Sequence, residues 1–321
     1  MTSIPECMPY SYEQVFNCKT RPLDELKKDF NSLVKFKADV NPRKFCGNKI
    51  LYHYQMKNLL ECRRGNKNWK TLQEWFDDDE LKEKLWKDTV HRNRRDKAPY
   101  PSPTDVYECH RLNNGSIVFF KSSTAKYIYK LFNAKNVLDP TAGWGGRMLG
   151  AMSLGINYTG IDTNINMKEA YANMMEIGNP WGTNLGDEEL YMKYESQGKD
   201  YGMKMIWKSC LDVDFTQEKY DLVLTSPPYS NMEIYEHMKP WETDEHFYKE
   251  FLIPLLNKLH DETDCPLCIN ISPKMYDTLI KKYNYKECDT KIDLRQQLGQ
   301  QYKTKSQDYI YIWRHKLCAQ E

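Results

Sequence analysis

The sequence contains no run of about 18 apolar residues, so no segment is expected to cross a membrane as a helix. Residues 1–10 lack the charged and then apolar pattern of a secretion signal, which predicts an intracellular protein. The 10 cysteines are scattered without the spacing of a disulfide framework. We therefore expect free thiols in a reducing compartment, the cytoplasm or the nucleus.

Metal-ligand spacing is also missing. One Cys-x-x-Cys pair, Cys265 and Cys268, has no second pair at a matching distance along the chain. Because residues 267–271 read as a strand, these thiols are predicted to pack in the core rather than to bind zinc. The sequence predicts no metal site.

The chain carries little net charge, +1 at pH 7, but the charge is unevenly distributed. Residues 1–100 contain 21 Lys and Arg against 15 Asp and Glu, and the remaining 221 residues contain 25 against 30. Local basic clusters of this kind can contact phosphate groups, although a solvated helix face gives the same pattern. The clusters consist of Lys57, Arg63, Arg64, Lys67 and Lys70, and of Arg92, Arg94, Arg95 and Lys97.

An apolar strand followed by a glycine-rich turn and a helix is predicted at residues 137–154. Gly143 and Gly145 allow a tight turn and a close approach of the backbone to a ligand, and the helix offers free N–H groups. A second predicted strand ends in Asp162, about 20 residues later, the spacing that brings a carboxylate to ribose hydroxyls in a βαβ unit. The third glycine of a nicotinamide-dinucleotide motif is missing, which disfavours that cofactor.

A third predicted strand, residues 221–224, stops at Thr225-Ser226-Pro227-Pro228-Tyr229. Two consecutive prolines fix the backbone and donate no hydrogen bonds, so nearby carbonyl groups stay free to accept from a ligand. Ser226 adds a hydroxyl and Tyr229 a planar ring. Acceptors beside an aromatic plane suit a nucleobase with an exocyclic amine, although an ordinary turn after a strand would look similar.

Together these motifs resemble the class I S-adenosylmethionine-dependent methyltransferases, in particular the DNA amino-methyltransferases that modify N4 of cytosine or N6 of adenine. The resemblance covers residues 116–315 and rests on D-P-T-A-G-W-G-G at 139–146 and T-S-P-P-Y at 225–229. It implies an α/β fold with a doubly wound, mostly parallel seven-stranded sheet, here with a helical N-terminal extension. It also implies S-adenosyl-L-methionine as the cofactor.

The resemblance assigns roles residue by residue. The implied cofactor-binding residues are Asp139, Pro140, Thr141, Gly143, Gly145 and Asp162, with Lys121 to Thr124 as further candidates. The family's acid near the adenine is replaced here by Ser209-Cys210-Leu211-Asp212, so either Ser209 or Asp212 is expected to contact that ring. The implied catalytic residues are Ser226, Pro227, Pro228 and Tyr229.

The expected reaction is direct methyl transfer to a base that is flipped out or single-stranded. Ser226 and the Pro227 carbonyl would accept both N–H protons of the amine, which favours a pyramidal nitrogen with a free lone pair. A serine before Pro-Pro-Tyr favours N4 of cytosine over N6 of adenine, by resemblance. DNA is the expected partner; an RNA base, a glutamine amide of a protein and a non-catalytic nucleic-acid-binding module are the alternatives.

Two regions are expected, a basic helical part at 1–104 and a methyltransferase domain at 105–321, joined by a proline-rich hinge at 98–104. Helices are predicted at 22–38, 49–64, 70–92 and 122–132, and strands near 135–139, 158–162, 204–208, 221–225, 266–272 and 308–314. Asn113-Asn114-Gly115 predicts a hairpin between strands at 106–112 and 116–121.

The remaining polar segments are candidates for surface contacts. The insertion at 178–202 is expected to form a surface loop or a small excursion. Recognition of the nucleic acid could use the N-terminal part, residues 231–250, or the glutamine-rich residues 291–307.

Overall fold

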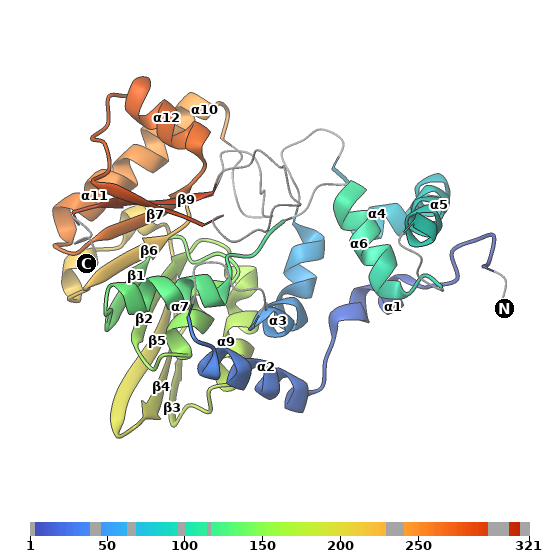
Figure 1. The fold of residues 1–321 in the computed structure, drawn as a ribbon, viewed down its shortest axis with the longest axis horizontal. Coiled ribbons are helices and arrows are strands. Elements are labelled where there is room, and N and C mark those ends of the chain that lie inside the picture. Colours follow the sequence, from blue (N-terminus) through green and yellow to red (C-terminus); the bar gives the residue numbers. More distant parts are fainter. Residues whose placement is uncertain are drawn as a thin grey trace.

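The computed structural model describes residues 4–38, 46–62, 69–95, 100–113, 117–228, 241–294 and 308–314. In these ranges nine strands form one sheet in the order β3-β4-β5-β2-β1-β6-β7-β9-β8 (Figure 1). Five central strands are parallel: β5 (Lys199–Trp207), β2 (Asn157–Asp162), β1 (Asn136–Asp139), β6 (Leu222–Thr225) and β7 (Leu267–Ile271). The other four, β3 (Gly182–Leu185), β4 (Glu189–Ser196), β8 (Thr290–Asp293) and β9 (Tyr309–Trp313), pair antiparallel at the two edges.

Helices cover both faces of the sheet, and alternate strand residues enter different cores. On β6, Leu222 and Leu224 pack into one core and Val223 into the other. The first core includes residues of α7 (Ser122–Leu131), α8 (Gly146–Met152) and α9 (Lys168–Glu176), and the second includes α11 (Ile253–Glu262) and α12 (Pro273–Lys281). The mixed α/β fold and all six expected strands are therefore confirmed.

The expected number of strands was wrong, because the insertion at 178–202 is not a loop. It supplies β3, β4 and the first part of β5, which extend the sheet as an antiparallel ribbon. Leu190, Met192 and Tyr194 alternate along β4 and are buried, so this segment joins the core despite its polar composition.

The expected hairpin was also wrong. Residues Pro103–Asn113 form helix α6, which begins where Ser102 and Asp105 bond to each other's backbone N–H groups. Val106, Tyr107 and His110 are buried at helical spacing, so the segment predicted as the first strand of the hairpin is a helix. Residues 117–121 form no strand, and residues 114–116 lie outside the described ranges.

The N-terminal part contains α1 (Tyr12–Phe16), α2 (Leu23–Lys35), α3 (Asn48–Glu61), α4 (Leu72–Asp77) and α5 (Asp79–Arg95). The expected helix at 70–92 is divided at Asp78, whose Oδ1 accepts from the Leu81 N–H. Buried residues of these helices are continuous with the core on one face of the sheet: α2 and α3 lie next to the α/β part, and α1, α4 and α5 group with α6 farther from the strands (Figure 1). Tyr52 of α3 and Phe119, for example, have ring centroids 4.9 Å apart.

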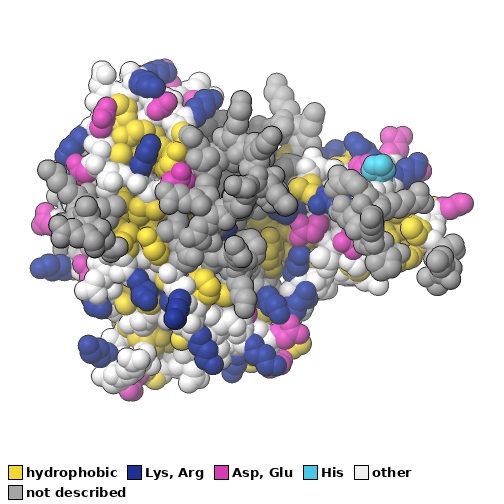
Figure 2. Space-filling view, viewed as in Figure 1, with side chains coloured by type: hydrophobic (Ala, Val, Ile, Leu, Met, Phe, Trp, Pro, Cys, Tyr) yellow, Lys and Arg dark blue, Asp and Glu magenta, His cyan; other side chains and the backbone are white. Residues whose placement is uncertain are grey.

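Lys and Arg side chains gather along the lower part of the face shown in Figure 2, with few Asp and Glu among them, and are mixed with acidic side chains elsewhere on the described surface. Arg63, Arg64, Lys67, Lys97 and residues 295–307 lie outside the described ranges, as do the side chains of Arg94 and Arg95. Within those ranges, no helix is long and apolar enough to cross a membrane. The same ranges contain no cluster of three His, Cys, Asp or Glu side chains that could hold a metal ion.

Candidate functional site

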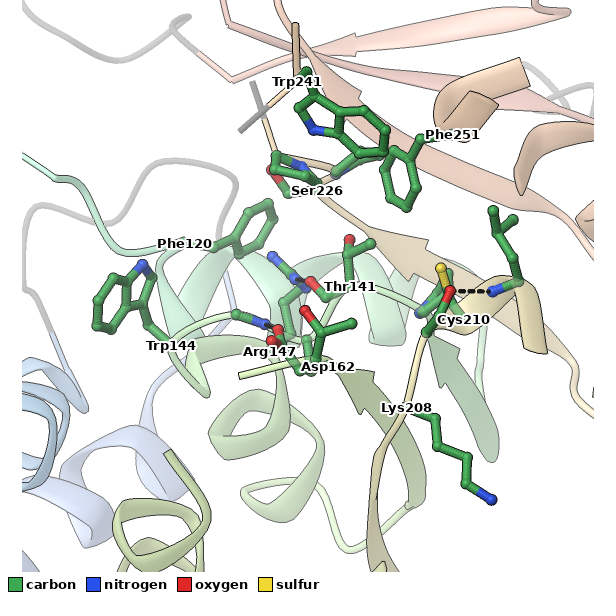
Figure 3. A pocket seen from close by; sticks show the side chains of 18 of the residues that line it. Phe120, Thr141, Trp144, Arg147, Asp162, Lys208, Cys210, Ser226, Trp241 and Phe251 are labelled. Atoms are coloured by element: carbon green, nitrogen blue, oxygen red, sulfur yellow. Dashed lines mark hydrogen bonds between the residues drawn. The ribbon is translucent and has the colours of Figure 1, made fainter. Parts of the chain in front are cut away.

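A pocket of about 660 Å³ lies at the carboxyl ends of β1, β2, β5 and β6 (Figure 3). The chain runs outward from β1 to β2 and later to β5, and returns to β6 on the other side of β1. In open parallel sheets, ligands bind where the strand order reverses in this way. Residues of both sequence motifs line the pocket, among them Thr141, Gly143, Asp162, Ser226, Pro227 and Pro228.

The glycine-rich turn is held by contacts on several sides. Gly143 and Gly145 have φ of +59° and +91°, a region that favours glycine. At Gly146, a Cβ atom would lie 2.0 Å from the Phe120 carbonyl oxygen, so only glycine fits at this crossing. The Tyr171 hydroxyl donates to the Gly143 carbonyl oxygen at 2.8 Å. The turn is therefore a fixed part of the pocket wall.

One of these contacts comes from the N-terminal helices. The Gln55 Nε2 atom donates to the Trp144 carbonyl oxygen at 3.3 Å, and Asn58 Nδ2 donates to Gln55 Oε1 at 2.8 Å. Both side chains are buried. Helix α3 thus helps to position the glycine-rich turn, a role that the sequence analysis missed.

Asp139 does not line the pocket but lies beneath it, fully buried. Its Oδ2 atom accepts from Arg147 Nε at 2.6 Å and from the Tyr158 hydroxyl at 2.7 Å, while Oδ1 accepts from the Thr225 hydroxyl at 2.8 Å. Burial opposes the charge of Arg147, but the attraction of Asp139 outweighs it and raises the pKa of this guanidinium. Arg147, which the sequence analysis also missed, reaches the pocket.

Asp162 is placed at the end of β2 with its carboxylate at the pocket. Its Oδ2 accepts from the Gly143 N–H at 2.8 Å and its Oδ1 from the Asn164 N–H at 2.9 Å. Burial raises the pKa of this carboxyl to about 6 despite the two backbone donors. A carboxylate oxygen has more than one acceptor position, so Asp162 can still accept from a ligand.

Of the residues that follow β5, some line the pocket and others do not. Ser209 lines the pocket, whereas Asp212 is exposed and does not line it. Cys210 also lines the pocket, and burial raises the pKa of its thiol to about 12, so it stays protonated at neutral pH. Gly145, like Asp212, is not among the pocket-lining residues.

Ser226 lies on the side of the pocket where Trp241 and Phe251 are drawn in Figure 3. These two rings are 5.6 Å apart between centroids and provide an aromatic wall. Tyr229, which the sequence analysis assigned to stacking, lies outside the described residues. The Ser226 hydroxyl is 3.3 Å from both the carbonyl oxygen and the Oδ1 of Asn270. Asn270 was missed as well, although a single amide in the apolar strand β7 was a visible signal.

Comparisons with family models and with curated proteins find no match. Among solved structures, the chain aligns with the candidate methyltransferase yhhF of Escherichia coli at 11% identity and a TM-score of 0.33, over 60% of this chain and 86% of that one. A candidate RNA methyltransferase of Pyrococcus horikoshii aligns at 20% identity and a TM-score of 0.32, over 60% and 81%. TehB of Haemophilus influenzae aligns at 15% identity and a TM-score of 0.34, over 65% of this chain and 66% of that one.

Proposed function

We propose that the protein transfers a methyl group from S-adenosyl-L-methionine to the exocyclic amine of a DNA base, with N4 of cytosine favoured over N6 of adenine. One observation carries this proposal: the glycine-rich turn, Asp162 and the Ser226-Pro227-Pro228 segment, far apart in the sequence, line one pocket. A cofactor-binding half and a base-binding half are thereby combined at adjacent strand ends.

The residues of the first half fit such a cofactor. Asp162 would accept from the ribose hydroxyls, Ser209 would contact the adenine ring, and the turn at Gly143 would hold the methionine end. The Arg147 guanidinium adds a cationic group at the pocket that suits a carboxylate. When bound, the cofactor supplies a methyl group on a positively charged sulfur.

The second half would bind and activate the target amine. An exocyclic amine is a weak nucleophile because its lone pair is delocalised into the ring. Acceptance of its two N–H protons by Ser226 Oγ and the Pro227 carbonyl favours a pyramidal nitrogen and frees that lone pair. Trp241 and Phe251 would cover the base in place of the stacking it loses on leaving the duplex, together with Tyr229. The burial that keeps the Cys210 thiol protonated argues against a covalent cysteine intermediate.

The proposal is tested by incubation of the purified chain with methyl-labelled S-adenosylmethionine and, separately, with DNA, RNA and unfolded protein. We expect label in DNA and N4-methylcytosine in its nucleoside digest by mass spectrometry. Label in RNA alone, or on glutamine, would transfer the proposal to one of the alternative substrates. An absence of label in all three polymers would overturn it.

Affinity for the cofactor is expected to fall as the pH drops below about 6, because desolvation raises the pKa of the Asp162 carboxyl to about 6 and the group must be ionised to accept from hydroxyls. From pH 7 to pH 5 the dissociation constant should rise by about tenfold, as expected for one group with this pKa. Calorimetric titration at several pH values measures this change. In Asp162→Asn the affinity should be lower and independent of pH in this range; a pH profile that matches the wild type would contradict the assignment.

A further inference from the structure

Asn270 is a buried amide whose orientation is fixed by its neighbours. Its Nδ2 atom donates to Asp308 Oδ1 and to the Tyr309 carbonyl oxygen, each at 2.8 Å. A carboxylate and a carbonyl only accept hydrogen bonds, so the NH₂ end of the amide must face them. The Oδ1 end is therefore turned toward Ser226.

This orientation fixes the hydrogen bonding of the Ser226 hydroxyl. Its two partners, the Oδ1 and the carbonyl oxygen of Asn270, are each 3.3 Å away and are both acceptors. A hydroxyl has one proton and two lone pairs. With its proton directed to Asn270, Ser226 presents only lone pairs to the pocket that it lines.

We propose that Asn270 is a positioning residue that makes the Ser226 hydroxyl a hydrogen-bond acceptor and so selects a target group that donates. The inference rests on the proposed function and extends it to specificity. An amine such as N4 of cytosine meets the lone pairs with an N–H. The corresponding oxygen of uracil would meet them with lone pairs of its own, so the deaminated base is disfavoured.

The position of Asn270 on β7 explains how one side chain can do this. β7 lies between β6, which Ser226 directly follows, and β9, whose first residue, Tyr309, accepts from the Asn270 amide. Asp308, the other acceptor, directly precedes β9. Two acceptors beside β9 thus set the direction of the hydrogen bonds from Asn270 back to Ser226.

The test is a double-mutant cycle on methyl transfer with Asn270→Leu and Ser226→Ala. Loss of a fixed acceptor should lower kcat by about tenfold in Asn270→Leu, and Ser226→Ala should lower it by about 10–100-fold. Cofactor affinity should stay within about twofold, since neither group is assigned to that half of the pocket. In the Ser226→Ala background, Asn270→Leu should add less than about twofold, because its effect passes through the missing hydroxyl.

Two further variants separate positioning from folding. Cys268→Ala removes buried volume from the same strand, on the face opposite to that of Ile269. At temperatures below the melting temperature of this variant, kcat should be unchanged. Asp308→Ala keeps Asn270 and leaves the Tyr309 carbonyl to accept from its Nδ2 atom, so Oδ1 still faces Ser226 and kcat should fall by less than about threefold. Equal losses from Asn270→Leu with and without Ser226, or a loss in folded Asp308→Ala as large as in Asn270→Leu, would overturn the inference. A wild-type chain without transfer activity would instead refute the proposed function itself.

Discussion

Asp139→Ala is expected to destabilise the protein by about 3–5 kcal/mol, because it leaves a buried guanidinium without its carboxylate. The side chains of Arg147 and Asp139 are 4% and 0% exposed, and Arg147 Nε lies 2.6 Å from Asp139 Oδ2. The same substitution also removes the acceptor for the hydroxyls of Tyr158 and Thr225. Urea unfolding followed by circular dichroism measures the loss.

An exposed ion pair supplies the matched control. Asp24 and Lys28, one helical turn apart on α2, are largely exposed, and Asp24→Ala should cost less than about 1 kcal/mol. Replacement of both buried partners, Asp139→Leu with Arg147→Met, should be less damaging than Asp139→Ala alone, since no unpaired charge remains. A loss in Asp139→Ala no larger than in Asp24→Ala would contradict the assigned network.

Removal of residues 1–104 is expected to abolish cooperative folding of the remaining chain, so that a fragment of residues 105–321 shows no sigmoidal thermal transition. The reason is that α2 and α3 contribute buried residues to one core of the sheet, whereas α1, α4 and α5 group with α6 away from the strands (Figure 1). Lys126 is 3% exposed and donates from Nζ to the carbonyl oxygens of Leu33 and Val34. Without α2 these contacts are lost, and apolar side chains of the core that α2 and α3 cover are exposed to water.

The fragment experiment also tests the predicted domain boundary at 104. Scanning calorimetry compares the thermal transitions of the full chain and of the fragment. The variant Gln55→Leu of the full chain removes one contact of α3 and keeps all the helices. It should still fold, but its affinity for the cofactor should be lower, because the Trp144 carbonyl loses its donor. A fragment that melts cooperatively near the temperature of the full chain would show that the two regions fold independently.

The central strands and the placement of the motifs could be predicted from the sequence because their signals are local. The strands β6 and β7 are short apolar runs, and polar residues stand at or just after strand ends, as Asp162 does at the end of β2 and Ser226 after β6. Carboxyl ends of parallel strands lie at one edge, so the two motifs were expected to meet. Their meeting in one pocket follows from that rule.

The remaining features depend on contacts between distant residues. Nothing local in β7 specifies that Asn270 will face Ser226, which is 44 positions away and on a neighbouring strand. Gln55 and Trp144 are 89 positions apart, and only the packing of α3 onto the turn brings them together. The strand predicted at 106–112 is a helix for a related reason, since the burial of α6 depends on its packing against α1 and α5.

We propose that the pocket at the carboxyl ends of β1, β2, β5 and β6 binds S-adenosylmethionine through Asp162. Isothermal titration of the wild type and of Asp162→Ala with this cofactor tests it most directly, with NAD as the comparison ligand. We predict saturable binding of one molecule per wild-type chain, no binding of NAD, and a loss of about 1.5–3 kcal/mol in Asp162→Ala for each charged hydrogen bond removed. Equal affinity of the two proteins, or no binding by the wild type, would contradict the account.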